Sequence, residues 1–540
     1  MLGFLSKKRI TTSNTGNRKK EVRNSMFDNE NTFIKMRDAG KEKEFDSLYE
    51  NALKEAETYF SKEYPNLAAG EVKEKGKIKD ISPIDGKEIA TFQMSSPETV
   101  DKTLGILHSS YRKWFDMGYV ERSRILLKAA DIMSDRKFLL AAMLAYENGK
   151  NRYEAMGDVD EAIDFMRYYS LNLIENQGFV RFTGKGYKNE ESQSIMKPYG
   201  VFAVIPPFNF YSITIGMTVC PLVVGNAVVL KPSSDIPLSS YIGIKILHEA
   251  GVPKEVLAYL AGSGSVVGQK LSESDLVSGF VFTGSREVGM SLYRKATEKR
   301  PRVVVTEMGG KDAIIVSAKA DLSKAVEGTA RAAFGYSGQK CSACSLVYVH
   351  EAIYDKFVPM LVERVKKMQV GDPRKKDTFV TPVVNAGAYE KFKTLMAAIP
   401  KEGEILYGGK TRGEAGYYVE PTIVGNLKQD SFVIRDELFL PILAIAKVKS
   451  VDDAIQRINA SEYGLTGGIF SEDLAEIEHY FATADVGVLY ANRTSGGSTG
   501  AMVGSQPFVG WKMSGVSGKG TGSFYYLQQF LREQSQTIAH

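Results

Sequence analysis

The 540-residue sequence has few cysteines and few histidines. Its three cysteines, Cys220, Cys341 and Cys344, cannot form a disulfide framework, so we expect a reducing compartment. Cys341 and Cys344 form a C-x-x-C pair, but the chain has no second pair and only five histidines, so we predict no metal site. A thioredoxin-like redox pair is also disfavoured, because the C-x-x-C follows a helical pattern instead of opening one.

A large excess of charge is also absent. The formal net charge is +5 at pH 7, and no face rich in Lys and Arg recurs along the chain, which argues against a nucleic-acid partner. The longest uncharged run, 198–230, exceeds the length of a membrane span, but proline, glycine and asparagine interrupt it. This pattern favours a buried strand, helix and strand, so we expect no membrane partner and a cytoplasmic location.

The composition, 43% hydrophobic and 25% charged, is that of a soluble globular protein with two or three domains. Residues 1–25 differ, with seven Lys or Arg against one acidic residue, Glu21. We predict a flexible extension over 1–30. An upstream translation start ahead of Met26 is an alternative, and a transit peptide, which would imply the mitochondrial matrix, is another.

The pattern of apolar residues changes along the chain. It is helical over most of 96–171, and from residue 201 short strands alternate with helices. A second alternating block starts at Arg302–Thr306 and runs past Ile469. Such alternation predicts an α/β fold with two doubly wound parallel sheets, whose ligands lie beyond the carboxyl ends of the strands. The strands predicted in the first block are Val201–Ile205, Ala227–Leu230, Val256–Leu260 and Gly279–Phe282.

Cys341 lies in a polar turn, Gly335–Ser345, between a helical segment and the strand-like Leu346–Val349. A turn of this kind can hold a thiol at the mouth of a cleft, where nearby positive potential lowers its pKa. The alternative is a thiol that only packs in the interior, as we expect for Cys344 at the start of the strand. Residues that could assist a nucleophile therefore have to come from elsewhere in the chain.

Four such candidates follow predicted strands. Asn209, after Pro206-Pro207, could donate its amide to an oxygen that becomes negative, or could only form a turn. Lys231 could bind ribose hydroxyls or phosphate, or could be a solvated lysine. The turn 284–289 opens a helix whose free N–H groups could face a pyrophosphate. Glu307 could be a general base with a raised pKa, or could pair with a lysine.

Taken together, these motifs resemble those of the aldehyde dehydrogenase superfamily, and the resemblance extends from residue 82 to the C-terminus. The motifs are Pro207-Phe208-Asn209-Phe210, Leu230-Lys231-Pro232-Ser233, Phe282–Gly289, Glu307-Met308-Gly309-Gly310-Lys311, Gly338-Gln339-Lys340-Cys341, Asp436–Pro441 and Tyr463–Gly468. Within the superfamily the chain is most similar to the branch that oxidises L-glutamate γ-semialdehyde. Ser342 after the cysteine and the segments 161–165, 309–316 and 499–515 carry that similarity.

The resemblance implies NAD(P)-dependent oxidation of L-glutamate γ-semialdehyde to L-glutamate in proline catabolism. Cys341 would attack the aldehyde to give a thiohemiacetal and then a thioester, Asn209 would stabilise the oxyanion, and Glu307 would activate the hydrolytic water. The alternatives are another semialdehyde or general aldehyde as substrate, or a catalytically silent binding protein on the same fold. A CoA-acylating enzyme is disfavoured because Glu307 is present.

The resemblance also implies which residues bind the cofactor and the substrate. The cofactor residues would be Lys231, Ser234, Gly284, Ser285, Gly289, Glu437 and Phe439. The substrate residues would be Ser342, Gly500, Ala501 and Glu161. Many family members have glutamate where this chain has Ser234, so NADP is expected to be usable beside NAD. Leu440 replaces a usual glycine, and the loop 492–499 is longer than usual.

The implied domain organisation has four parts, and the implied assembly is a homo-oligomer, a dimer or larger. The expected parts are a flexible extension at 1–30, a dinucleotide-binding domain at 31–180 and 199–305, a catalytic domain at 306–495, and an oligomerisation arm at 181–198 and 515–540.

Overall fold

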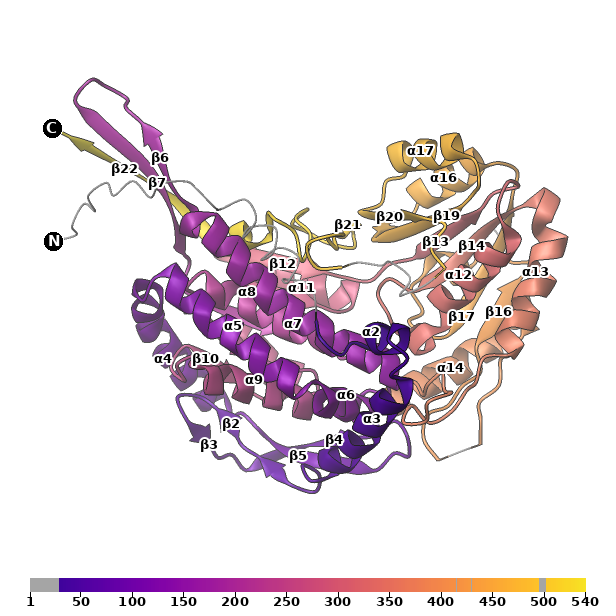
Figure 1. Cartoon of the computed structure of the whole chain (residues 1–540), viewed down its shortest axis with the longest axis horizontal. Coiled ribbons are helices and arrows are strands. Elements are labelled where there is room, and N and C mark those ends of the chain that lie inside the picture. The colour runs from indigo at the N-terminus through magenta and orange to yellow at the C-terminus, as the bar shows by residue number, and fades with distance from the viewer. Residues whose placement is uncertain (1–28, 414, 429, 495–501) are drawn as a thin grey trace.

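The computed structural model describes residues 29–413, 415–428, 430–494 and 502–540, and shows two α/β units and a projecting three-stranded arm (Figure 1). The predicted flexible extension therefore lies almost entirely outside the described residues. The helices of the first unit are α2 (Phe33–Asp38), α3 (Glu42–Glu57), α4 (Pro97–Asp116), α5 (Tyr119–Asp135), α6 (Lys137–Glu147), α7 (Arg152–Glu175), α8 (Tyr211–Val223), α9 (Pro237–Ala250), α10 (Gln269–Glu273) and α11 (Arg286–Glu298).

The first unit is built on a seven-stranded sheet in the order β12-β11-β8-β9-β10-β2-β3. The strands from β12 to β10 are parallel, and β2 and β3 add to the edge in antiparallel pairing. The strands of this unit, with the β1-β5-β4 sheet, are β1 (Glu63–Tyr64), β2 (Asn66–Leu67), β3 (Glu71–Val72), β4 (Gly76–Ile81), β5 (Glu88–Met94), β8 (Val201–Ile205), β9 (Ala227–Leu230), β10 (Leu257–Tyr259), β11 (Val277–Thr283) and β12 (Val303–Glu307).

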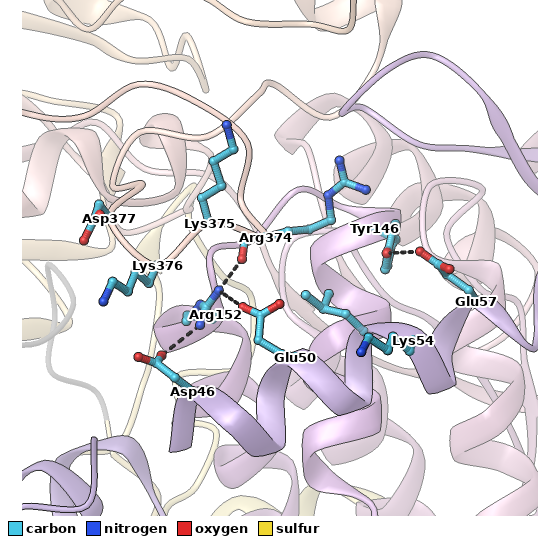
Figure 2. A pocket seen from close by; sticks show the side chains of 11 residues that line it. Asp46, Glu50, Lys54, Glu57, Tyr146, Arg152, Arg374, Lys375, Lys376 and Asp377 are labelled. Atoms are coloured by element: carbon cyan, nitrogen blue, oxygen red, sulfur yellow. Dashed lines mark hydrogen bonds and ion pairs between the residues drawn. The ribbon is translucent and has the colours of Figure 1, made fainter. Parts of the chain in front are cut away.

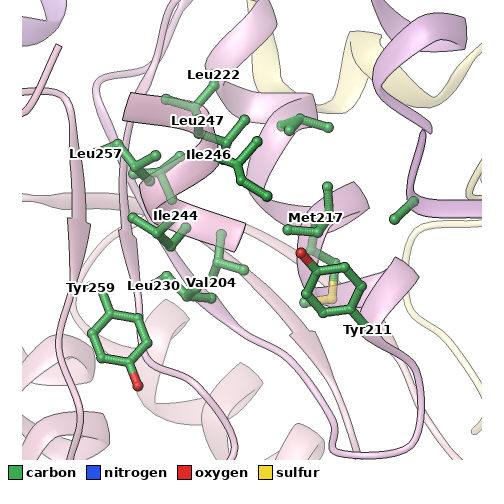
Figure 3. Close-up of a cluster of buried hydrophobic side chains, with 14 of the residues drawn as sticks. Val204, Tyr211, Met217, Leu222, Leu230, Ile244, Ile246, Leu247, Leu257 and Tyr259 are labelled. Carbon is green, nitrogen blue, oxygen red and sulfur yellow. The ribbon is translucent and has the colours of Figure 1, made fainter. Parts of the chain in front are cut away.

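The core of this unit lies between the sheet and its helices. Strands β8 and β9 consist almost entirely of buried apolar residues, as expected for parallel strands that are covered on both faces. Figure 3 shows Val204 and Leu230 from these strands close to Ile244 of α9, in a cluster that also includes Leu222 of α8. The uncharged run 198–230 therefore folds as the predicted strand, helix and strand. Among the described residues, no helix has both the length and the apolar character needed to cross a membrane.

The second unit contains a seven-stranded sheet in the order β15-β16-β17-β14-β13-β19-β20, in which only β15 is antiparallel to its neighbour. Its helices are α12 (Leu322–Phe334), α13 (Glu351–Lys366), α14 (Ala386–Ala398), α15 (Phe432–Arg435), α16 (Val451–Asn459) and α17 (Leu474–Thr483). Its strands are β13 (Asp312–Val316), β14 (Cys344–His350), β15 (Glu404–Tyr407), β16 (Thr422–Gly425), β17 (Ile442–Val448), β19 (Thr466–Phe470) and β20 (Val488–Ala491), with a separate pair β18 (Tyr463–Gly464) and β21 (Trp511–Lys512).

The predicted α/β class is confirmed, but both sheets are mixed because antiparallel strands occupy their edges. The prediction that the second block starts at Arg302–Thr306 is wrong. Strand β12 pairs in parallel with β11, from Gly279↔Val303 to Thr283↔Glu307, and so completes the first sheet. The chain then changes sheet between β12 and β13, through Gly309 and Gly310 and without an intervening helix.

The arm is an antiparallel sheet of β6 (Val180–Gly184), β7 (Glu190–Pro198) and β22 (Leu531–Ala539), in the order β22-β7-β6. It projects from the body of the molecule and includes the C-terminal strand (Figure 1). Its residues are mostly exposed or half-buried. That it joins copies of the chain stays a prediction.

Asn226 connects the arm to the first unit. Its side chain is fully buried, accepts from the Gly200 N–H at 3.0 Å, and donates to the carbonyls of Pro221 at 3.2 Å and Phe530 at 2.9 Å. We predict that Asn226→Ala lowers the free energy of unfolding by about 2–4 kcal/mol, because the Gly200 N–H and the Phe530 carbonyl lose this buried partner and the Pro221 carbonyl keeps only its backbone bond to the Asn226 N–H. A lower urea midpoint would show this. Asn51→Ala, at an exposed position of α3, is the control, and equal shifts in the two variants would contradict the assignment.

Candidate functional site

The predicted site residues lie where the edges of the two large sheets meet. Strands β8, β9, β11 and β12 are parallel neighbours, so the residues that follow them share one edge of the first sheet. The second sheet contributes the loops that precede β13, β14 and β17. The Asn209 amide donates to the Gln339 carbonyl at 2.9 Å, and the Phe208 ring packs edge-on against Phe439. The predicted oxyanion amide and nucleophile loop are therefore joined directly.

The loop before Cys341 has an unusual backbone. Tyr336, Ser337 and Gly338 have φ values of 49°, 53° and 67°, in the left-handed region that non-glycine residues rarely adopt. A Cβ at Gly338 would lie 2.6 Å from the Leu440 carbonyl oxygen. Strain of this kind persists only where the surroundings hold it in place.

Hydrogen bonds supply that support. The Tyr336 hydroxyl donates to the Asn148 carbonyl at 2.7 Å, and the Ser337 hydroxyl bonds both backbone groups of Thr381. The Gln339 side chain accepts from the Val384 N–H at 2.8 Å and donates to carbonyls of its own loop and of Pro382. The position of Cys341 is thus fixed by contacts with both units.

The two close cysteines differ in their surroundings. Cys344 begins β14, is buried, and points its thiol at the Leu346 carbonyl, which confirms the packing role predicted for it. Cys341 is half-buried in the turn. Burial raises the pKa of its thiol well above the usual value, and the carboxylates of Asp312, Glu437 and Glu307 raise it further.

The expectation that positive potential lowers the Cys341 pKa is therefore wrong for the protein alone. The adjacent Lys340 forms an ion pair with Glu154 at 2.5 Å, and among the described groups that act most strongly on the thiol the charged ones are carboxylates. Forming the thiolate near neutral pH thus requires a proton acceptor or a cation bound beside it.

Glu307 ends β12 and is 7% exposed. Its carboxylate accepts one hydrogen bond, from the Gly510 N–H at 2.9 Å, and burial raises its pKa well above the usual value. A buried carboxylate with a raised pKa can accept a proton from a thiol or from water near neutral pH. The alternative prediction, pairing with a lysine, is not what the structure shows.

The turn after β11 has the properties of a phosphate-binding turn. Ser285 is the N-cap of α11 and accepts from the Val288 N–H. The other first-turn N–H groups have no partner within the helix, so they can face an anion. A Cβ at Gly284 would lie 2.7 Å from the Phe282 ring, and one at Gly289 would lie 2.6 Å from the Met308 sulfur, so both positions need glycine.

Lys231 follows β9 and is buried, with its ammonium bonded to the Pro232 carbonyl. Burial lowers its pKa to about 8, an effect that the carboxylate of Asp235 opposes. A buried cation at this edge of the sheet, whose one hydrogen bond to the described residues is to a carbonyl, is suited to binding ribose hydroxyls or phosphate. Ser234, three residues on, is exposed.

The loop before β17 approaches the β12–β13 turn closely. Glu437 accepts from the Gly310 N–H at 3.3 Å, and a Cβ at Gly309 would lie 1.8 Å from the Glu437 carboxylate. Burial raises the Glu437 pKa to about 7. Phe439 has φ 56°, and Leu440 is buried beside the nucleophile loop. These residues form a cradle with one carboxylate, Glu437, and one aromatic ring, Phe439, which suits a nicotinamide ribose and ring.

The predicted substrate residues are only partly placed. Ser342 is buried directly after the nucleophile. Glu161, on α7, accepts from the Ser212 hydroxyl at 2.9 Å, and burial together with Asp158 raises its pKa to about 7. Gly500 and Ala501 lie outside the described residues, so their role stays a prediction.

Several charged residues close to the site were given no role by the sequence. Lys150 and Asp158 form a buried ion pair, and Glu154 pairs with Lys340. The Lys311 ammonium is buried without a hydrogen-bond partner in the described structure, and burial lowers its pKa to about 8. Lys150, Glu154 and Asp158 follow none of the predicted strands, and Lys311, although it closes the Glu307 motif, has no role that the motif implies. Their tertiary contacts identify them.

Comparison with known proteins agrees with this geometry. The aldehyde dehydrogenase family model matches residues 71–535. The chain is 37% identical over 499 residues to the 1-pyrroline-5-carboxylate dehydrogenase of Geobacillus sp. (strain WCH70), covering 91% of this chain and 95% of the relative. The enzyme of that name from Halalkalibacterium halodurans is 37% identical over 500 residues, with the same coverage. A crystal structure of 1-pyrroline-5-carboxylate dehydrogenase from Thermus with bound NAD superposes with a TM-score of 0.87 at 32% identity, covering all of both chains.

The raised pKa of Glu307 has a consequence for stability. The folded protein holds the proton more tightly than the unfolded chain, so this carboxyl group costs stability as the pH rises from about 4.5 through its folded pKa. We predict that Glu307→Gln unfolds at higher urea concentration than wild type at pH 7 and above, and that the difference disappears near pH 4. Glu298→Gln, at an exposed position of α11, is the control. A destabilised Glu307→Gln at pH 8 would contradict the assignment.

Proposed function

The chain belongs to the aldehyde dehydrogenase family, and we propose that it oxidises L-glutamate γ-semialdehyde, the open form of Δ1-pyrroline-5-carboxylate, to L-glutamate in proline catabolism. It is an NAD-dependent oxidoreductase. The substrate assignment rests on one observation: over 91% of its length, the chain is similar to a relative named 1-pyrroline-5-carboxylate dehydrogenase. The junction of Cys341, Asn209 and Glu307 supports the chemistry.

In the first step the Cys341 sulfur attacks the aldehyde carbon and its proton passes to a base, for which Glu307 is placed at the same junction. The new S–C bond gives a thiohemiacetal, whose oxygen carries negative charge. The Asn209 amide and the Cys341 backbone N–H would donate to that oxygen. Because Asn209 is buried and already held at Gln339, little reorganisation is needed.

NAD, when bound, supplies the electrophile that accepts the hydride from the thiohemiacetal carbon. The carbon is thereby oxidised to a thioester on Cys341. Glu307 passes the thiol proton to solvent and then takes a proton from water, whose oxygen attacks the thioester. The C–S bond breaks to release glutamate, and the departing thiolate regains a proton to restore the thiol. Efficient hydrolysis requires the ionised form of Glu307, so activity rises with pH through its raised pKa.

The cradle described above fits a dinucleotide. Lys231 and the α11 N-terminus, with Gly284, Ser285 and Gly289, would hold the adenosine and pyrophosphate. Glu437 and Phe439 would hold the nicotinamide ribose and ring. Ser234 places no carboxylate at the position where many family members have glutamate, so we infer that NADP also serves.

The substrate carries an α-carboxylate that simple aldehydes lack. We propose that the Ser342 hydroxyl and the backbone N–H groups of Gly500 and Ala501 bind it, with Glu161 lining the same pocket. In the assembly we expect a homo-oligomer joined through the arm, with the first unit binding the cofactor and the second carrying Cys341. The matched relatives are bacterial, which supports a cytoplasmic location over the mitochondrial matrix.

Substrate choice can be measured with purified protein, NAD or NADP, and a panel of L-glutamate γ-semialdehyde, succinate semialdehyde and propanal. We expect the highest kcat/KM for glutamate semialdehyde, measured by absorbance of the reduced cofactor. Cys341→Ala should lose all detectable activity, and Cys344→Ala should keep it, because only Cys341 is in position to attack. Equal kcat/KM across the panel would refute the substrate assignment.

Ser342 can be tested separately from the chemistry. Ser342→Ala should raise KM for glutamate semialdehyde by about 10- to 100-fold, the usual worth of a hydrogen bond to a charged group, and leave KM for propanal unchanged. Ser345→Ala, three residues further in β14, is the control. If Ser342→Ala raises KM for both aldehydes equally, Ser342 does not bind the carboxylate.

A further inference from the structure

The turn between α6 and α7 and the first two turns of α7, residues 148–158, contact both catalytic loops. We call this segment the α6–α7 corner. Its charged and amide side chains are mostly buried, although the segment contributes no group to the chemistry described above. The contacts of the α6–α7 corner explain the polar residues in it.

The corner holds the loop of Asn209 on both flanks. Before Asn209, the Asn148 side-chain amide donates to the Phe208 carbonyl at 3.1 Å. After it, the Asp158 carboxylate accepts from the backbone N–H groups of Tyr211 at 3.0 Å and Ser212 at 2.8 Å. Helix α8 begins at Tyr211 and has no side-chain cap of its own, so Asp158 provides that cap from a neighbouring helix.

The same corner holds the nucleophile loop. The Asn148 carbonyl accepts from the Tyr336 hydroxyl at 2.7 Å, and Glu154 forms its ion pair with Lys340, next to the nucleophile. The Lys150 ammonium lies 3.9 Å from the centre of the Phe210 ring and 5.2 Å from that of Tyr336. One ammonium group is thus in contact with both loops.

Lys150 and Asp158 form an ion pair of 2.7 Å whose side chains are 1% and 0% exposed. Burial lowers the Lys150 pKa, and Asp158 opposes this effect. Removing two charges from water offsets much of their attraction, so a buried pair is a poor source of stability. The pair instead fixes the orientation of the Asp158 carboxylate, which must face both Lys150 and the N-terminus of α8.

The outer side of the corner is anchored as well. Arg152 is buried and donates to Asp46 and Glu50 of α3, each at 2.8 Å, and to the Arg374 carbonyl of the second unit (Figure 2). These four residues line a cavity of about 690 Å³ between α3 and the 374–377 turn. The corner is therefore a fixed support between the two units and not a mobile loop.

We propose that Asp158, held in place by Lys150, is a positioning residue for the reaction. It orients the side-chain amide of Asn209 towards the oxygen of the Cys341 adduct. The proposal rests on the proposed function for its chemistry. Asp158 is not among the residues proposed to bind substrate or cofactor, and it acts through the backbone of Tyr211 and Ser212.

A double-mutant cycle tests it. Asp158→Asn keeps the shape but halves the acceptor capacity, so it should lower kcat by about 10- to 100-fold, somewhat less than loss of an oxyanion donor, and change KM less than about 3-fold. In an Asn209→Ala background the same change should lower kcat by less than about 3-fold further, because the amide that Asp158 orients is absent. If the double variant instead loses the product of the two single-variant losses in kcat, the proposal is overturned.

The cycle is run on two reactions. One is aldehyde oxidation, and the other is hydrolysis of p-nitrophenyl acetate, in which Cys341 displaces p-nitrophenolate and water then releases acetate. The ester reaction develops the same oxyanion but needs neither NAD nor the correct aldehyde. If the aldehyde assignment fails, the ester cycle still decides the role of Asp158.

Asp160→Asn is the matched control, because Asp160 lies on the same helix and forms a comparable buried pair with Lys137 at 3.0 Å. Its backbone carbonyl accepts from the Asn29 side chain, and among the described residues no hydrogen bond joins Asp160 to the catalytic loops. We expect kcat within about 3-fold of wild type despite similar packing. If Asp160→Asn lowers kcat as much as Asp158→Asn does, the effect of Asp158→Asn is structural and the proposal fails.

If Asp158→Asn does not fold, Asn148→Ala replaces it in the same cycle. This variant removes the hydrogen bond on the other flank of the Asn209 loop, and the expected result is the same.

Discussion

The hydrogen bond from the Asn209 amide to the Gln339 carbonyl is the contact on which the site depends. It joins the carboxyl edge of the first sheet to the loop before β14 of the second, and so sets where a thiol from one unit meets an amide from the other. The left-handed backbone of Tyr336 and Ser337 is tolerated because this junction and its neighbouring hydrogen bonds hold it. A preorganised junction of this kind lowers the cost of stabilising an oxyanion.

Burial at the junction explains the electrostatics of the site. It raises the pKa of both Cys341 and Glu307, because burial disfavours the charged form of each group. A carboxyl group with an ordinary pKa would be a weaker base towards water, whereas a buried one is poised for proton transfer near neutral pH. The same burial costs stability, which is a common property of catalytic groups.

Much of the fold could be predicted from the sequence, because strands such as β8 and β9 are continuous apolar runs bounded by clear turns. The placement of β12 could not, since nothing local states which sheet a strand joins. The positions of Asn209, Lys231 and Glu307 followed from strand ends. The direction of the Cys341 pKa shift did not, because it depends on carboxylates that are distant in sequence. The Lys150–Asp158 pair is likewise visible only in three dimensions.

The central claim is that oxidation passes through an acyl group on Cys341 that Glu307 helps to hydrolyse. Incubating Glu307→Gln with NAD and L-glutamate γ-semialdehyde measures this most directly, by following reduced cofactor and then the mass of the Cys341 peptide. We predict a burst of about one equivalent of reduced cofactor per site, slower than in wild type because Glu307 is also the base for the thiol, and a glutamyl thioester on Cys341. Steady turnover at the wild-type rate, or an unmodified Cys341 peptide after the burst, would contradict the account.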